Sequence, residues 1–227
     1  MVCYQDERTA AGRGCAEIGR CGQRSDVAPL QDLLHYVVKG LSQVAVEGRK
    51  FGVNDRETNR FTRKAIFSTL TNADFDPERL VDFIHQAVEK RESLKDKVKA
   101  AGGQIDFGDG PSTFEPGSTC EALVAQGHEV VDPSDSDIKA NILALREILI
   151  DGIRGIAACA DYAAILGKED DSVYVFIQEG LASTLKENTS IHDSIALVLK
   201  CGEVKLKIME MLDVAVAGTY GHSRPTA

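Results

Sequence analysis

Apolar residues recur along most of this chain at the spacing of an α-helix, and this periodicity limits what the chain can fold into. In residues 26–52, where Asp26 is the predicted N-cap, one helical stripe holds Leu30, Leu33, Leu34, Val37, Val38, Leu41, Val44 and Ala45. Similar patterns predict helices over 55–70, 77–100, 120–130, 137–166, 170–186 and 190–217. Short alternating runs of β-branched residues, which are typical of strands, are nearly absent. The sequence therefore predicts an all-α fold.

The second half of the chain repeats part of the first. When residues 30–70 are placed on residues 145–185 without a gap, ten positions are identical, where average composition gives about two or three. The identical pairs are Leu30/Leu145, Leu34/Leu149, Gly40/Gly155, Ala45/Ala160, Gly52/Gly167, Asp55/Asp170, Phe61/Phe176, Ser68/Ser183, Thr69/Thr184 and Leu70/Leu185. Conservative pairs in the same frame include Asp32/Glu147, Leu33/Ile148, Lys39/Arg154 and Leu41/Ile156. Chance similarity between amphipathic helices is the alternative, and we predict two duplicated three-helix bundles preceded by a Cys-rich cluster-binding loop.

Each copy of the repeated unit carries a glycine in the middle of a predicted helix, Gly40 in the first copy and Gly155 in the second. Glycine costs about 1 kcal/mol relative to alanine inside a helix, so its repetition requires a physical reason. A residue without a side chain lets a neighbour approach the backbone closely, and we therefore predict close contact with another helix at both glycines.

Composition shifts along the chain divide it into five parts. We predict a Cys-rich iron–sulfur loop over 1–25, a first three-helix bundle over 26–100, a linker over 101–136, a second three-helix bundle over 137–218, and a junction to further domains over 219–227. The first 18 residues of the linker hold five glycines and two prolines, a composition that interrupts regular elements.

The charge of the chain excludes one large class of partner. There are 26 Lys and Arg residues against 35 Asp and Glu, which gives a net charge of -9 and no basic stripe, so nucleic acid is not expected as a primary partner. No apolar stretch is long enough to serve as a secretion signal or to span a bilayer, and we expect no membrane association and a cytoplasmic location. In a reducing compartment, clustered cysteines indicate a metal rather than disulfides.

Three of the six cysteines are grouped at the N-terminus, where Cys3, Cys15 and Cys21 follow the spacing Cys-x2-Asp-x8-Cys-x5-Cys with Asp6 at the second place. Soft thiolate ligands favour zinc or an iron–sulfur cluster over hard ions. Zinc sites usually present paired short Cys knuckles, so an iron–sulfur cluster is the better interpretation, with zinc and unligated cysteines as alternatives. The other three cysteines, Cys120, Cys159 and Cys201, are scattered and are predicted to pack in the core.

The opening MVCYQDERTAAGRGCAEIGRCG, followed by DVAPLQDLLHYVVKGLS, resembles the N-terminus of the hybrid cluster proteins, also called hydroxylamine reductases. The similarity continues through FSTLTNADFD, ALREILIDGIRGIAACADYAAILG and LVLKCGEVKLKIMEMLDVAVAGTYGH, and it covers essentially the whole chain. In that family this region is a helical domain of two three-helix bundles. Its terminal cysteines hold a [4Fe–4S] cluster when the spacing is short, which implies ligation by Cys3, Cys15 and Cys21.

The chain departs from the family pattern at Asp6, where the family has its second cluster cysteine. A carboxylate is a harder and weaker iron ligand than a thiolate. Three outcomes stay open: a [4Fe–4S] cluster with Asp6 as a ligand and a labile iron, a [3Fe–4S] cluster that lacks this corner, or no stable cluster. Without a metal, Asp6 would be an ordinary loop carboxylate.

The resemblance also implies that this chain is not catalytic by itself. Family members are more than twice as long, and the hybrid cluster that reduces hydroxylamine or nitric oxide is ligated in the α/β domains that follow. The expected role is electron transfer, with a redox donor protein and the C-terminal α/β domains as partners, and a homodimer by analogy with the carbon monoxide dehydrogenases. The rival hypothesis is a cluster-free helical module that serves a structural or interaction role.

Overall fold

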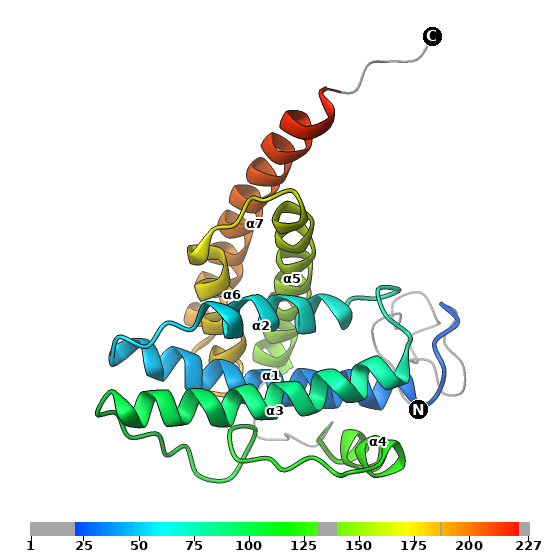
Figure 1. Ribbon diagram of the computed structural model, residues 1–227, viewed down its shortest axis with the longest axis vertical. Coiled ribbons are helices and arrows are strands. Elements are labelled where there is room, and N and C mark those ends of the chain that lie inside the picture. The colour runs from blue at the N-terminus through cyan, green and yellow to red at the C-terminus, as the bar shows by residue number, and fades with distance from the viewer. Residues whose placement is uncertain (1–20, 131–139, 187, 223–227) are drawn as a thin grey trace.

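The structure is a computed structural model that describes residues 21–130, 140–186 and 188–222. Over these residues the chain forms seven helices and no strand (Figure 1), so the all-α prediction is confirmed. The helices are α1 (Val27–Lys50), α2 (Arg56–Ser68), α3 (Pro77–Ala100), α4 (Cys120–Val130), α5 (Ala140–Ile165), α6 (Asp171–Ser183) and α7 (Ile191–Tyr220). None of these helices is long and apolar enough to cross a membrane.

Two of the long helices, α1 and α5, end at glycines that the duplicated frame matches. Gly52 has a φ of 76° and Gly167 a φ of 77°, a conformation that favours glycine. In both turns the residue after the glycine, Val53 or Lys168, donates its N–H to a carbonyl of the last helical turn, at 3.0 and 2.9 Å. Both ends therefore have the hydrogen bonding of a glycine C-cap.

The short helices α2 and α6 begin in the same way. Asp55 accepts a hydrogen bond from the N–H of Thr58 at 2.8 Å, and Asp170 accepts one from the N–H of Ser172 at 2.8 Å. Each side chain satisfies a backbone donor that has no partner within its helix.

Each capping carboxylate also binds a lysine from the third helix of its set. Lys97 of α3 binds Asp55, and Lys207 of α7 binds Asp170 at 2.6 Å. Burial acts to raise the pKa of both carboxyls, but the hydrogen bonds from the lysine and from the helix N–H hold the pKa of each below its ordinary value. The same cap thus joins the second helix to the third in both halves.

The ends of α2 and α6 also correspond. Ser68 and Ser183 donate their hydroxyls to the carbonyl three residues earlier, at 2.8 and 2.6 Å. Thr69 and Thr184 do the same at 2.8 and 2.7 Å. The frame that pairs residue 30 with residue 145 therefore matches the bounds and the terminal hydrogen bonds of these two helices. The duplication stays a prediction, and these matches support it.

The two sets of helices cross each other and share one core. In Figure 1, α1, α2 and α3 run roughly side by side, while α5, α6 and α7 run across them. Besides the contacts within each set, α1 packs on α6 and α2 packs on α5. One continuous cluster of buried side chains includes Leu34, Ile66, Ile84, Ile153, Ile177 and Ile208. The two predicted bundles therefore do not have separate cores.

A buried arginine joins the two sets at this crossing. Arg63 of α2 forms an ion pair with Asp161 of α5 at 3.0 Å and donates a hydrogen bond to the hydroxyl of Tyr174 at 2.9 Å. That hydroxyl donates to Glu169 at 3.0 Å, and Glu169 also accepts two hydrogen bonds from Arg60 at 2.9 and 2.7 Å. Because Arg63 is almost fully buried, its partners are needed to offset the loss of solvation.

The stretch that composition predicted as a linker, 101–136, contains α4, and α4 packs along α1. A Cβ placed on Gly127 would lie 2.2 Å from the carbonyl oxygen of Pro29, so α4 touches the backbone at the start of α1. Only a residue without a side chain fits at this contact.

A buried arginine of α3 holds the segment between α3 and α4 against α1 by donating to two backbone carbonyls of that segment. Arg91 of α3 is buried and donates to the carbonyls of Pro111 and Phe114, at 2.8 and 2.9 Å. The ring of Phe114 meets Tyr36 edge to face, with the ring centroids 5.6 Å apart. A Cβ on Gly40 would lie 2.1 Å from the carbonyl oxygen of Pro111. The segment therefore packs directly on the middle of α1.

The prediction of helix contact at the two matched glycines is wrong for Gly40. Its nearest neighbours are the backbone atoms of Pro111 and Ser112, which belong to a turn and not to a helix. At Gly155 the nearest atom does come from a helix, because the ammonium nitrogen of Lys205 on α7 would lie 3.2 Å from a Cβ there. At both glycines the missing side chain leaves space for a polar group of another segment. The helical periodicity of the sequence does not reveal what occupies that space.

We predict that Gly40→Ala lowers the free energy of unfolding by about 3 kcal/mol, because the added methyl group overlaps a backbone carbonyl that Arg91 holds in place. Urea unfolding followed by circular dichroism measures the change. Gly202→Ala is the control, since a Cβ at this exposed position of α7 meets nothing within 4 Å. We expect this control to raise stability by up to about 1 kcal/mol. Equal effects of the two substitutions would contradict the role given to Gly40.

Candidate metal centre

The structure places one of the four predicted cluster ligands. Cys21 is free and half-buried, and it lies in the turn that leads into α1. The predicted ligands Cys3, Asp6 and Cys15 lie outside the described residues.

The residues after Cys21 are fixed to the helices by two glutamines. Gln23 is buried, and its side-chain amide donates to the side-chain oxygen of Gln31 at 2.8 Å. Gln31, on α1, donates in turn to the backbone carbonyl of Asp74 at 2.9 Å. Each amide is buried, so breaking one of these bonds would leave a polar group without water or a partner. This chain of bonds ties the Cys21 turn both to α1 and to the loop before α3.

The N-terminus of α1 faces this turn without an acidic cap. Asp26 stands at the predicted N-cap position, but its side chain makes no capping hydrogen bond and instead binds Arg24. The first turn of α1 also holds no acidic residue. The first backbone N–H groups of α1, next to the segment that carries Cys21, are therefore without a side-chain cap.

A second thiol lies at the same end of α1, and no pattern in the sequence indicated this. Cys120, the first residue of α4, is close enough to Arg24 and Asp26 for their charges to act on it. Burial raises the pKa of the Cys120 thiol above its ordinary value, and the neighbouring carboxylates Glu121 and Asp26 raise it further. These effects favour the neutral thiol, so Cys120 is a poor candidate ligand.

The remaining described cysteines pack as the sequence predicted. Cys201 belongs to the buried core, and Cys120 and Cys159 are half-buried against it. Across residues 21–130, 140–186 and 188–222, no group of three His, Cys, Asp or Glu side chains could hold a metal ion.

Charged side chains of α1 and α5 form a group. Asp32 and Lys39 of α1 lie near Arg154 and Glu147 of α5, and these residues make up the two charged pairs among the conservative pairs of the duplicated frame. Burial raises the pKa of Asp32 to about 6, partly opposed by the charge of Arg154, and burial lowers the pKa of Lys39 to about 8. Sequence periodicity did not indicate this group, although the matched charge pairs were the signal that could have revealed it.

His35 belongs to the same face of α1 and is buried. Its Nε2 has no hydrogen-bond partner. Burial lowers the pKa of this imidazole well below its ordinary value, and the positive charges of Lys39 and Arg154 act in the same direction. His35 is therefore neutral at physiological pH and contributes no charge to the group.

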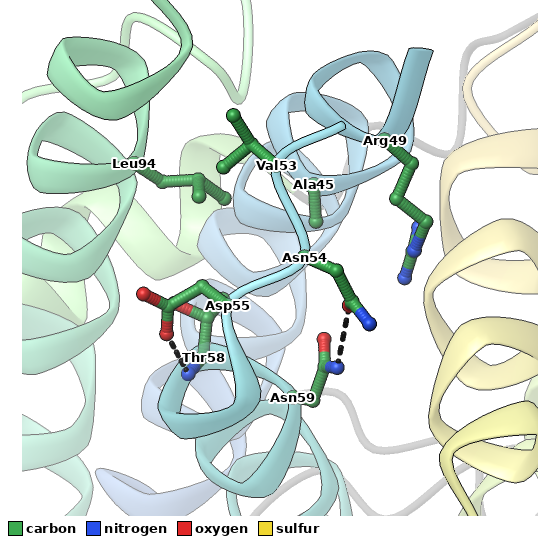
Figure 2. A pocket seen from close by; sticks show the side chains of 8 residues that line it. All are labelled: Ala45, Arg49, Val53, Asn54, Asp55, Thr58, Asn59 and Leu94. Carbon is green, nitrogen blue, oxygen red and sulfur yellow. Dashed lines mark hydrogen bonds between the residues drawn. The ribbon is translucent and has the colours of Figure 1, made fainter. Parts of the chain in front are cut away.

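A small hollow lies between the end of α1, the start of α2 and α3 (Figure 2). It is lined by Ala45, Arg49, Val53, Asn54, Asp55, Thr58, Asn59 and Leu94. Asn59 donates to the side-chain oxygen of Asn54 at 3.0 Å, and Asp55 caps α2 through Thr58. The space is too narrow for a water molecule, so these polar side chains serve the turn and the helix cap rather than a ligand.

Comparison with known proteins gives a family match over the whole chain. The family profile described as "Prismane/CO dehydrogenase family" matches residues 1–227.

Several curated relatives carry the name hydroxylamine reductase. The protein from Syntrophobacter fumaroxidans is 54% identical over 227 residues, which is 100% of this chain and 42% of the relative. The protein from Methanocella arvoryzae is 47% identical over 223 residues, 98% of this chain and 41% of the relative. The protein from Solidesulfovibrio magneticus is 47% identical over 227 residues, with shares of 100% and 41%. The chain thus spans about two fifths of the length of these relatives.

We predict that Asp32 makes stability fall as the pH rises from about 4 to about 6. Its pKa in the folded chain, about 6, lies above the ordinary value of 3.8, so the folded state holds this proton more tightly than the unfolded state does. The stabilisation is present below pH 4 and is lost as the pH passes through 6. In Asp32→Asn this contribution is absent. The unfolding free energy of the unmodified chain minus that of Asp32→Asn should therefore change by about 1–2 kcal/mol between pH 4 and pH 6.

Urea unfolding at pH 4, 5, 6 and 7 measures this difference. Asp82→Asn, which removes a carboxylate from an exposed position of α3, is the matched control and should give a nearly constant difference. Parallel pH curves for Asp32→Asn and the unmodified chain would contradict the prediction.

Proposed function

The chain belongs to the Prismane/CO dehydrogenase family, and on this premise we propose that it is the electron-transfer part of a hydroxylamine reductase. The observation that carries the proposal is the match with proteins of that name over the whole of this chain and about two fifths of theirs. The full-length enzyme would reduce hydroxylamine or nitric oxide, with the reaction taking place outside these 227 residues.

We propose that Cys3, Cys15 and Cys21 hold an iron–sulfur cluster, with Asp6 at the fourth corner. Cys21 fits this role because its thiol is free, half-buried and close to the positive end of α1. The donor set of three thiolates and one carboxylate suits a [4Fe–4S] cluster with one labile iron, or a [3Fe–4S] cluster. When bound, the cluster supplies one-electron transfer.

The described residues have a positioning role in this proposal. Gln23 and Gln31 fix the turn after Cys21, and α1 supplies the positive helix end. No described residue is proposed as catalytic. A redox donor protein would deliver the electrons in the cytoplasm, where a reducing environment keeps Cys21 out of disulfides and available to iron.

We predict that Cys21→Ser loses at least half of the bound iron of the anaerobically purified chain. The control Cys201→Ser should keep the iron and lose only the packing of a buried sulfur. Iron analysis and low-temperature EPR of oxidised and dithionite-reduced samples measure the outcome. Asp6→Cys should give a four-iron signal in the reduced state, because a thiolate then fills the fourth corner. A chain without iron and without a signal in either state would overturn the electron-transfer role and support the cluster-free helical module.

We also propose that the C-terminal α/β domains of the full-length enzyme cover the outer face of α7. This face is a stripe of exposed apolar residues from the first turn of the helix to the last: Ile191, Ile195, Leu199, Leu206, Met209, Val216 and Tyr220. Leu206 is 70% exposed and Tyr220 is 75% exposed. The C-terminal part of α7 extends beyond the other helices (Figure 1). A continuous apolar stripe of this length is typical of a surface that packs on another domain.

A chimera that joins this chain to the remainder of the Syntrophobacter fumaroxidans relative tests the outer face of α7. We predict that Leu206→Asp destabilises the chimera by about 2 kcal/mol and changes the isolated chain by less than about 0.5 kcal/mol, because only in the chimera is Leu206 buried. Phe107→Asp is the matched control at an exposed apolar residue outside α7. Equal effects in both proteins would contradict the proposal, and a homodimer of the isolated chain that Leu206→Asp disrupts would assign the face to a second copy.

A further inference from the structure

We propose that Cys159 and Lys205 form a peroxide-sensitive pair that links α5 to α7. The ammonium nitrogen of Lys205 lies 3.1 Å from the sulfur of Cys159 and donates to the carbonyl oxygen of Gly155 at 2.7 Å. Both side chains are half-buried, so a small oxidant can reach the sulfur while the surrounding helices hold the two groups together.

The Cys159–Lys205 pair depends on Gly155, whose matched glycine in the first half of the chain has a different neighbour. The missing side chain of Gly155 leaves the space that the Lys205 ammonium occupies. The matched glycine of the first half, Gly40, instead accommodates the Pro111 carbonyl. In the same frame Cys159 takes the place of Val44, which is fully buried. The second copy thus combines a thiol, an ammonium group and the space for both.

The other described thiols outside the candidate metal centre have different surroundings. Cys201 is 5% exposed and packs against Gly152, and burial raises the pKa of its thiol, although the charge of Lys205 acts in the opposite direction. Burial also raises the pKa of Cys120, and two carboxylates act on it in the same direction. Among the described residues, Cys159 is the cysteine with an ammonium group within hydrogen-bond distance. Reactive cysteines lie in positively charged, partly exposed surroundings of this kind.

The reaction at this pair consumes one hydroperoxide. The Cys159 thiolate attacks one peroxide oxygen, a sulfur–oxygen bond forms, the oxygen–oxygen bond breaks, and sulfur loses two electrons to the peroxide. Lys205 gives a proton to the departing hydroxide, which leaves as water, and then takes the proton of the sulfenic acid. The products are water and a sulfenate paired with the Lys205 ammonium, so both atoms and charges balance.

The test measures sulfenate formation at each cysteine of the full chain. The chain is treated with hydrogen peroxide, sulfenates are trapped with dimedone, and peptides are quantified by mass spectrometry over time. We expect Cys159 to be labelled about tenfold faster than Cys201. Labelling of Cys159 no faster than that of Cys201 would overturn the proposal, whether or not the chain carries an iron–sulfur cluster.

Substitutions of Lys205 distinguish the effect of its ammonium group on the labelling of Cys159 from the effect of solvent exposure of the sulfur. Lys205→Met should slow the labelling of Cys159 about tenfold, and Lys205→Arg, which keeps the charge, should retain most of it. Lys200→Met is the matched control, because Lys200 lies on the same helix and pairs with Glu203. An unchanged rate in Lys205→Met, with thermal unfolding showing that this variant is folded, would overturn the role of the ammonium. If that variant does not fold, the comparison of Cys159 with Cys201 in the unmodified chain decides the question.

Discussion

The enclosed position of α1 is the constraint on which the rest of the structure depends. Four helices, α2, α3, α4 and α6, pack against it, so most of its circumference is buried. A helix in this position needs apolar side chains on nearly all sides, and its buried polar groups are stabilised by partners where it has them, with the Nε2 of His35 as an exception. Gln31 binds Gln23 and Asp74, and Ser42 donates to the carbonyl of Val38 at 2.7 Å. The turn that carries Cys21 leads directly into this helix, so the candidate metal centre is attached to a helix that four others enclose.

Local signals explain which parts of the fold the sequence could predict. Gly52, Asp55 and Pro77 mark helix ends through backbone conformation and capping, and the predicted helices ended within a few residues of the observed ones. The contact between Gly40 and Pro111 joins residues far apart in the chain, and no local pattern indicates it. The charged group around Asp32 was missed for the same reason. For the candidate metal centre, the sequence supplied the spacing of the ligands, and the structure adds the surroundings of Cys21.

The two predicted copies of the repeated unit have matching helix ends and different neighbours along α1 and α5. Asp55 and Asp170 cap equivalent helices and bind equivalent types of partner, so the turns are alike. Helix ends depend on a few neighbouring residues and tolerate little change. The faces of α1 and α5 have different neighbours, because α4 packs on α1 and has no counterpart on α5 among the described helices. Matched positions on these faces hold different residues, such as Val44 and Cys159.

The packing also separates the Cys21 turn from the outer face of α7. Within the described residues, α1 has no close backbone contact with α5 or α7, and the two sides of the molecule meet through α2 and α6. The buried ion pair between Arg63 and Asp161 and the hydrogen bond from Arg63 to Tyr174 hold this connection rigid. The crossing of the two sets of helices therefore lies between the outer face of α7 and the Cys21 turn, together with the charged group that joins α1 to α5. A well-packed crossing of this kind would hold the cluster and the covering domains, both proposed above, at a fixed separation.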